Sequence, residues 1–453
     1  MRAADGGIRI GQLSAERGPL AQADAAASAV RGARIFPSVG GILRTAGARL
    51  PYAAHFLNLA YAGAAVVLAV FAAQSRAARG RPAFDGWTLA LTLIAGGLLV
   101  AILWGGRRVN AALCALTSGV LAAGQIALHP RRVADYPASS TRDPAPYVMF
   151  TGLPGEDDHN ELGYRGRAPV MPKGDEYRVL MVGGSAVYGK GPAPLTLPAQ
   201  LQRLARHRVA RKVTVYNWGV VSQVSGQELA TVAHRAGRFS PDLIVLYDGG
   251  NDFYSAFTGD PRPGYPFNFV LAQRATDIFQ VGDWRGLAAA GLTQSNLLRA
   301  LFPAELSDAA ARLEPIRRAV GYGSPEWEER VAGQYLENLD SACRLAGGIG
   351  ARLAVFLQPV VYFSPQADRY TQMGMGFRSY VERGYDRVRA GLTGLAERHP
   401  GGGCAFVDLS RTCAKGECEF QDFIHPSPET RAPIAEAMFA ELRSRGLLPA
   451  AVR

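Results

Sequence analysis

The chain has little lysine and no pattern typical of a nucleic-acid-binding protein. Its formal net charge of +11 comes almost wholly from arginine. The lysines are Lys173, Lys190, Lys212 and Lys415. Basic residues are not interleaved with aromatic residues in any stripe, and no known nucleic-acid-binding motif is present. We therefore expect no nucleic-acid partner, and the positive charge instead suits anionic lipid or an acidic polymer.

Cysteine is also scarce, and its spacing fits no zinc motif. Cys114 lies in an apolar segment and Cys343 in an expected helix, whereas Cys404, Cys413 and Cys418 cluster near the C-terminus. Cys413 and Cys418 are close enough to close a small loop by a disulfide, which would imply an oxidising compartment. The alternative is that these thiols are free and buried.

Charged residues are absent from three long apolar runs. These runs cover Phe56–Ala73, Trp87–Trp104 and Val109–Leu128. Each is about 18–20 residues long, which is enough for a helix to cross the hydrocarbon layer of a membrane. We therefore predict about three transmembrane helices within residues 51–129, the alternative being three buried helices of a soluble bundle. The polar residues 1–50 are expected to form a flexible tail and not a cleavable signal peptide.

The orientation in the membrane depends on arginines that are almost balanced. One set, before the first run and between the second and third, favours a cytoplasmic N-terminus, and a second set opposes it. The first set is Arg44, Arg49, Arg107 and Arg108; the second is Arg76, Arg79, Arg81, Arg131 and Arg132. The possible Cys413–Cys418 disulfide decides the orientation, because it would form on the oxidising side of the membrane. We expect a multi-pass protein of the bacterial inner membrane, with its large C-terminal domain outside the cytoplasm.

Beyond a linker over 130–158, residues 159–453 alternate between strand-like and helix-like segments. Such alternation predicts an α/β domain with a parallel sheet covered by helices on both faces. The expected strands are 178–183, 213–217, 242–247, 352–357 and 405–407. The expected helices are 196–206, 226–237, 327–346, 376–398 and 428–445. The segment 253–325 has no strong period and is expected to be an insertion beside the site.

The most informative motif is a serine at the end of the first of these strands. Residues 180–191 read LMVGGSAVYGKG, so that an apolar run ends in two glycines and Ser185 follows at once. Glycines allow the sharp turn that presents a serine hydroxyl at the carboxyl end of a strand. By itself this pattern is more often a plain turn.

Three later segments supply the other groups that a serine nucleophile needs. Gly219 follows the second strand, and Asn251 follows the third. Asp422 and His425 stand three residues apart near the C-terminus. Serine needs a base within hydrogen-bond reach, and that base needs a third group to fix its tautomer.

The order of Ser185, Gly219, Asn251 and the Asp422/His425 pair resembles the SGNH (GDSL-like) hydrolase family over residues 160–445. The resemblance implies a three-layer α/β/α, flavodoxin-like domain and a catalytic triad of Ser185, His425 and Asp422. It assigns the oxyanion hole to the backbone N–H groups of Ser185 and Gly219 and to the side chain of Asn251. It implies no metal and no organic cofactor.

Two residues depart from the family pattern. Gly184 stands before the serine where the best-known members have aspartate. Ser222 stands where a second glycine often follows the first by three residues. The aspartate-to-glycine departure at Gly184 weakens the assignment to the family more than it weakens the expected mechanism. The departure at Ser222 affects the expected backbone geometry of the turn after Gly219.

Three polar residues near the motifs allow other interpretations. Asp248 and Asp252 flank Asn251 and could form a glycosidase pair, although capping of turns fits them better. Gln358 ends the next strand and either lines the pocket or simply terminates the strand.

We therefore expect a membrane-anchored serine esterase that removes an acyl group, above all acetyl, from a cell-envelope or exported glycan. The alternatives are an O-acyltransferase that acts on polysaccharide with the same triad, beside a multi-span membrane partner, and a non-catalytic glycan-binding or assembly protein. An acylated small molecule or glycan is the expected substrate.

Overall fold

The computed structural model describes residues 53–70, 73, 86–135, 142–156, 158–267, 269–282, 313–370 and 374–450. The expected tail over residues 1–50 lies outside this range. The strands are β1 (Arg142–Ala145), β2 (Met149–Gly152), β3 (Tyr177–Gly183), β4 (Val213–Gly219), β5 (Leu243–Asp248), β6 (Arg352–Leu357) and β7 (Cys404–Asp408). The labelled helices are α3 (Gly86–Trp104), α4 (Arg107–Asp135), α5 (Ser185–Tyr188), α6 (Leu197–Arg208), α7 (Ser225–Thr231), α8 (Gly250–Thr258), α9 (Phe269–Val281), α13 (Leu313–Val320), α14 (Pro325–Gly348), α15 (Gly374–Arg398) and α16 (Ala432–Ser444).

The N-terminal apolar runs form helices, and one of them has the length and composition of a membrane span. Among the described residues this is the helix Ala53–Val70, of which 22% is buried. The apolar stretch Leu89–Trp104 in α3 is shorter. The structure thus supports one of the three predicted spans.

Two asparagines connect these apolar helices. The amide of Asn58 donates to the backbone oxygen of Asn110 at 3.0 Å, and the amide of Asn110 donates to the carbonyls of Ala101 and Gly105 at 2.8 Å. Both asparagines are fully buried. Buried amide hydrogen bonds of this kind hold apolar helices in one register, because no water is there to replace the bonds.

The C-terminal part is built on a five-stranded parallel sheet, as the sequence predicts. The strand order is β4-β3-β5-β6-β7. Every residue of β3 and β5 is buried, which explains why these strands read as continuous apolar runs rather than alternating ones. The order reverses between β3 and β5, and in open α/β sheets ligands bind at the carboxyl ends of the strands at such a point.

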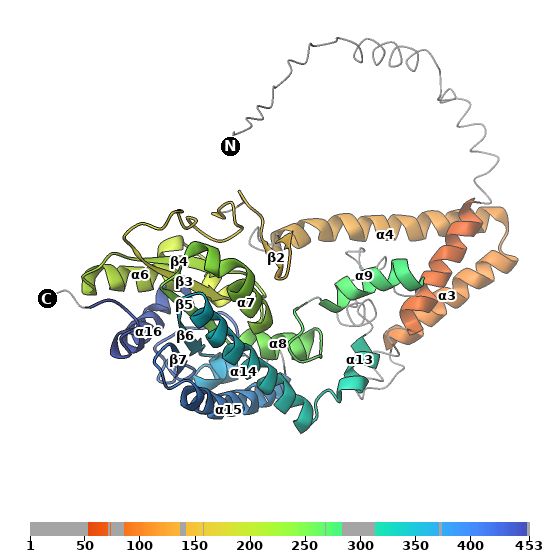
Figure 1. Ribbon diagram of the computed structural model, residues 1–453. Coiled ribbons are helices and arrows are strands. Elements are labelled where there is room, and N and C mark those ends of the chain that lie inside the picture. Colours follow the sequence, from red (N-terminus) through yellow and green to blue (C-terminus); the bar gives the residue numbers. More distant parts are fainter. Residues whose placement is uncertain are drawn as a thin grey trace, which may run out of the picture. The chain divides into compact units, whose positions relative to one another are not determined.

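Helices cover both faces of the sheet (Figure 1). On one face α6 packs against α16 and β4, and on the other α14 packs against α7, α15 and β6. The start of α14 is fixed locally, because the hydroxyl of Ser324 accepts a hydrogen bond from the amide of Trp327 and Pro325 occupies the first turn. The same arrangement of Thr196 and Pro198 begins α6.

Parts of the predicted linker are structured. The helix α4 continues to Asp135, and the antiparallel hairpin β1–β2 occupies residues 142–152. The amide side chains of Gln223 and Gln227 donate to the carbonyls of Phe150 and Val148 at 3.1 and 2.8 Å. The hairpin is therefore attached to the segment that joins β4 to α7, a contact that no local pattern signals.

Two disulfides lie in the C-terminal half. The predicted Cys413–Cys418 bond is confirmed, and a second bond joins Cys343 of α14 to Cys404 of β7. Cys114 is free and buried. The smaller loop is linked to the residues that follow it, because Gln366 donates to the carbonyl of Cys418 at 2.7 Å and accepts from the amide of Phe420 at 3.1 Å.

We predict unequal contributions of the two disulfides to stability. The Cys343–Cys404 bond closes a loop of 61 residues and Cys413–Cys418 one of 5. On the chain-entropy model, replacing both cysteines by serine lowers the free energy of unfolding by about 4 kcal/mol for the first pair and about 2 kcal/mol for the second. Urea denaturation of both double variants measures this, with Cys114→Ser as control. Equal losses would contradict the entropic account.

Candidate active site

The predicted nucleophile and oxyanion residues lie at the carboxyl ends of neighbouring strands. Ser185 is the first residue of α5, directly after β3 and Gly184. Asn251 lies in the first turn of α8, directly after β5. Parallel strands end at the same edge of the sheet, which brings these residues together from segments 66 positions apart in the numbering.

Ser185, His425 and Asp422 form one chain of hydrogen bonds. The Oγ atom of Ser185 is 2.6 Å from Nε2 of His425, and Nδ1 of His425 is 2.6 Å from Oδ2 of Asp422. The second carboxylate oxygen of Asp422 accepts from the backbone amides of Ile424 and His425 at 2.9 Å. A single turn thus fixes the acid relative to the imidazole, which explains the short spacing in the sequence.

The carboxylate of Asp422 is held in its ionised form. Burial raises the pKa of Asp422, but the hydrogen bond and charge of His425 and the two backbone amides together lower it, and the pKa lies below its ordinary value. An ionised Asp422 accepts a hydrogen bond from Nδ1–H of His425. Nε2 is then the atom that can accept the hydroxyl proton of Ser185.

Asn251 lies over the backbone of Gly184. Its side-chain Nδ2 donates to the carbonyl of Gln223 at 2.7 Å, and its second N–H remains for a ligand. A Cβ atom at position 184 would lie 2.1 Å from this Nδ2. The glycine that departs from the family pattern is therefore required here by the position of Asn251.

We predict that Gly184→Ala lowers kcat by about 10²–10³-fold with little change in KM, because the new methyl group displaces the oxyanion donor Asn251. Steady-state kinetics with a chromogenic ester measures this. Gly333→Ala is the matched control, since a Cβ at that position in α14 meets no atom within 4 Å. An unchanged kcat in Gly184→Ala would argue against a role for Asn251.

The N–H of Gly219, a predicted oxyanion donor, already has a partner within the protein. Its N–H donates to Oδ1 of Asn217 at 3.0 Å, and a Cβ there would lie 2.1 Å from the backbone nitrogen of Tyr188. Glycine is needed at 219 because α5 packs against it, not because substrate approaches it. The residues of this segment that line the pocket are Val221 and Ser222. The φ of Ser222 is 68°, in the left-handed region that favours glycine. The feature of the sequence that could have indicated this position is the second glycine of the family pattern, which Ser222 replaces here.

The pocket that contains Ser185 has a volume of about 330 Å³ and aromatic walls. Its aromatic lining is Tyr254, Phe267, Tyr362, Tyr370 and Phe423. The rings of Tyr254 and Phe423 stack with centroids 5.3 Å apart. Tyr254 and Phe267 come from the beginning of the segment 253–325, which was expected to be an insertion beside the site. Gln358 is buried against Gly250 and is not among the lining residues.

Three carboxyl groups are buried behind the oxyanion residues. Asp252 accepts from the hydroxyl and amide of Ser225 at 2.6 and 3.1 Å, which joins α8 to the start of α7. Neither Asp248 nor Asp252 lines the pocket, so they cannot act as a glycosidase pair on a ligand there. Glu228 completes the group, and neither of its carboxylate oxygens has a hydrogen-bond partner by distance and angle among the described residues.

This acidic cluster of Glu228, Asp248 and Asp252 holds protons at pH values where exposed carboxyls are ionised. Burial is the largest cause that raises the pKa of Glu228 and Asp248 well above their ordinary values, and the charge of Asp252 raises the pKa of both further. Burial also raises the pKa of Asp252, although hydrogen bonds from Ser225 oppose the change. The hydroxyls of Tyr335 and Tyr385 face the same space beside Gly249.

We predict that Glu228→Gln stabilises the protein, and more so at pH 8 than at pH 5. A raised pKa means that the unfolded chain loses its proton at a lower pH than the folded one, so wild-type stability falls as the pH rises above the ordinary value. The neutral amide removes this penalty. We expect a rise in Tm of about 2–4 °C at pH 8, the shift that 1 kcal/mol gives in a domain of this size. Thermal melts at both pH values, with exposed Glu337→Gln as control, measure it; equal Tm values at pH 8 would contradict the prediction.

Comparison with known proteins gives similar structures but no similar sequences. No protein-family model and no curated protein sequence matches the chain. An acetylxylan esterase from Geobacillus stearothermophilus is 13% identical with a TM-score of 0.34, and the match covers 61% of this chain and 97% of that one. A GDSL-like lipase from Bacteroides thetaiotaomicron is 11% identical with a TM-score of 0.32, over 59% and 88%. An alpha/beta hydrolase enzyme from the metagenome of Lake Arreo, Spain, is 15% identical with a TM-score of 0.33, over 60% and 97%. Because these sequence identities and TM-scores are low, the reaction is inferred from the atoms of the site itself.

Proposed function

We propose that the protein is a serine esterase that cleaves an acyl ester through an acyl-enzyme. The observation that carries this proposal is the pair of 2.6 Å contacts that join Ser185 Oγ to His425 Nε2 and His425 Nδ1 to Asp422. An arrangement of nucleophile, base and orienting acid at hydrogen-bond distance is the requirement for nucleophilic catalysis by serine.

In the first half of the reaction, Nε2 of His425 takes the hydroxyl proton while Oγ of Ser185 attacks the ester carbonyl carbon. The carbonyl oxygen becomes negative, and the N–H of Ser185 at the start of α5 and the amide of Asn251 donate to it. His425 then returns the proton to the leaving alcohol oxygen, the C–O bond breaks, and the acyl group remains on Ser185. Asp422 stays ionised and stabilises the imidazolium.

In the second half, water is the nucleophile that attacks the acyl-enzyme. His425 removes a proton from water, the hydroxide attacks the acyl carbonyl, and the proton passes to Oγ as the acid leaves. None of these steps requires a metal or an organic cofactor. The wall formed by Ser222 borders the same space and limits the size of the acyl group.

We assign the substrate to acylated glycans, with a small acyl group such as acetyl. The pocket of about 330 Å³ is small, and its aromatic walls offer flat apolar faces beside the serine. The helix Ala53–Val70 supports attachment to a membrane. The two disulfides support a catalytic domain on the oxidising side of that membrane. A multi-pass anchor in the inner membrane and a multi-span partner are part of the same proposal.

The test uses the full chain, purified in a non-ionic detergent, with a fluorophosphonate probe and with p-nitrophenyl acetate. We expect the probe to label Ser185, and acetate to be released. An added acetyl acceptor such as xylotetraose separates hydrolysis from transfer, because a transferase would move acetyl to the sugar. Absence of labelling on folded wild-type protein would overturn the serine mechanism and indicate a non-catalytic binding protein, whereas labelling without release would indicate a nucleophile with a narrow substrate range.

A further inference from the structure

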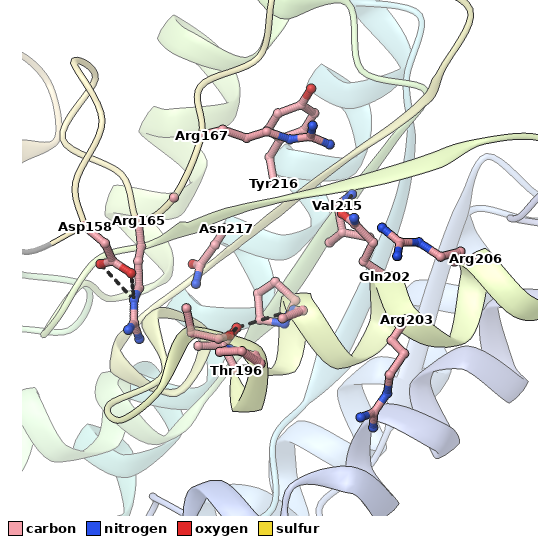
Figure 2. Close-up of a pocket in the computed structure, with 15 residues that line it drawn as sticks. Asp158, Arg165, Arg167, Thr196, Gln202, Arg203, Arg206, Val215, Tyr216 and Asn217 are labelled. Carbon is pink, nitrogen blue, oxygen red and sulfur yellow. Dashed lines mark hydrogen bonds and ion pairs between the residues drawn. The ribbon is translucent and has the colours of Figure 1, made fainter.

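A second pocket, larger than the one at Ser185, lies beside the edge strand β4. Its volume is about 560 Å³, and it shares no lining residue with the pocket of Ser185. Four arginines and one acidic residue line it, together with neutral polar side chains from α6 and β4 (Figure 2). The charged residues are Asp158, Arg165, Arg167, Arg203 and Arg206.

One of these arginines is fully engaged within the protein. Nε of Arg165 donates to both carboxylate oxygens of Asp158 at 2.9 and 2.7 Å. Its terminal nitrogens donate to the carbonyls of Tyr188, Gly189 and Gly191. Arg165 therefore neutralises the acid and holds the end of α5, and the excess positive charge of the pocket resides on the other three arginines.

Those three arginines have no carboxylate partner among the residues that the structure describes. Arg167 has a hydrogen bond of 3.4 Å to the hydroxyl of Thr214 and lies over the ring of Tyr216. Figure 2 shows Arg206 reaching from α6 towards Gln202 and Val215, whereas Arg203 points away from them. By contrast, Arg208 at the end of the same helix has a bidentate ion pair with Glu436 at 2.8 and 3.1 Å. The free charge of Arg167 and Arg206 thus faces the hollow beside β4.

Neutral donors lie between these charges. Gln202 accepts from the amide of Val215 at 3.0 Å with its side-chain oxygen, which leaves its NH₂ group as a donor. Asn217 donates to the carbonyl of Tyr188 at 3.1 Å. Guanidinium groups recognise carboxylates, and neutral amides recognise hydroxyls. A ligand that carries both groups on one ring fits this lining.

We propose that this pocket binds a carboxylate-bearing sugar residue of an acidic oligosaccharide. Its carboxylate lies between Arg167 and Arg206, and its hydroxyls contact Gln202 and Asn217. A membrane surface fits less well, because a flat array of headgroups cannot enter a hollow bounded by one helix and one strand. Asn217 of β4 lines the pocket and donates to the carbonyl of Tyr188, the last residue of α5. Ser185 begins that helix, about 4.5 Å away along the helix axis. A glycan held here passes close to the nucleophile.

Isothermal titration calorimetry of the full chain in non-ionic detergent tests this proposal, and the result does not depend on ester cleavage. The ligands are tetragalacturonic acid, neutral maltotetraose, inorganic phosphate and soluble dioctanoyl phosphatidylglycerol. We expect tetragalacturonic acid to bind, more weakly at high salt because the charges are screened, and maltotetraose not to bind at the same concentration. Arg167→Gln and Arg206→Gln each weaken binding roughly tenfold or more, since each removes a charge-assisted hydrogen bond.

Arg208→Gln is the matched control, because it removes an exposed arginine of the same helix outside the pocket, and it keeps wild-type binding. Thermal melts show that the variants are folded. Binding that survives both pocket substitutions overturns the proposal, as does the absence of binding. Tighter binding of phosphate or of the phosphatidylglycerol than of tetragalacturonic acid would instead identify a site for phosphate groups or for lipid.

Discussion

Replacing Ser185 with alanine is expected to lower kcat for ester hydrolysis by about 10⁴–10⁶-fold. The alanine has no hydroxyl to attack the carbonyl, so only the oxyanion donors and the pocket remain to assist water. His425→Ala is expected to cause a loss of similar size, and the double variant should be no slower than either single one, because the two side chains act as one unit. Steady-state kinetics with p-nitrophenyl acetate measures all three variants.

Ser444→Ala is the control, since Ser444 lies on the exposed end of α16 and bonds only to the carbonyl of Glu441. A Ser185→Ala variant that is folded and retains more than about a hundredth of wild-type kcat would exclude the proposed nucleophile. Losses that multiply in the double variant would show that Ser185 and His425 act independently, despite the 2.6 Å contact between them.

Asp422→Asn is expected to lower kcat by up to about 10⁴-fold, with the protein still folded. The amide would favour the wrong tautomer of His425, with the proton on Nε2, and that atom could no longer accept the proton of Ser185. The side chain of Asp422 is half exposed, so water can partly replace it and the loss is expected to be smaller than in a fully buried triad. Asp386→Asn, at an exposed position on α15, is the control.

The Asp422→Asn variant is also expected to change how the free energy of unfolding depends on pH. A carboxyl whose pKa is lowered on folding stabilises the native state above its ordinary pKa, and this contribution disappears as the pH falls through the folded value. The difference in free energy of unfolding between wild type and Asp422→Asn should therefore be largest near neutral pH and shrink below about pH 4. A difference that persists unchanged to pH 2 would mean that Asp422 acts by packing and not by charge.

The sequence predicts the sheet well because its strands are buried on both faces. Leu243–Tyr247 and Val179–Val182 are apolar runs with glycines close behind them, and a short run of this kind has few other interpretations in an alternating α/β chain. The triad was also predictable, since Asp422 and His425 are close in the sequence and need only one turn to meet.

Features that depend on packing between distant segments were not predictable. Gly219 ends β4 and Ser222 follows three residues later, and only the approach of Tyr188 to Gly219 shows which of them borders the pocket. The partner of Cys343 and the burial of Glu228 likewise depend on which helix crosses which strand. A glutamate in a helical pattern is ordinarily exposed, and nothing local marks this one as buried.

The nucleophile and its base are separated by 240 positions in the chain. A chain synthesised from its N-terminus first thus produces Ser185 long before His425, and the intervening residues include both disulfides. The serine has no base until the last strand has joined the sheet and the final loop has closed over it. Any ester cleavage that depends on Ser185 would therefore report complete folding, because an incompletely folded chain carries a serine without its base.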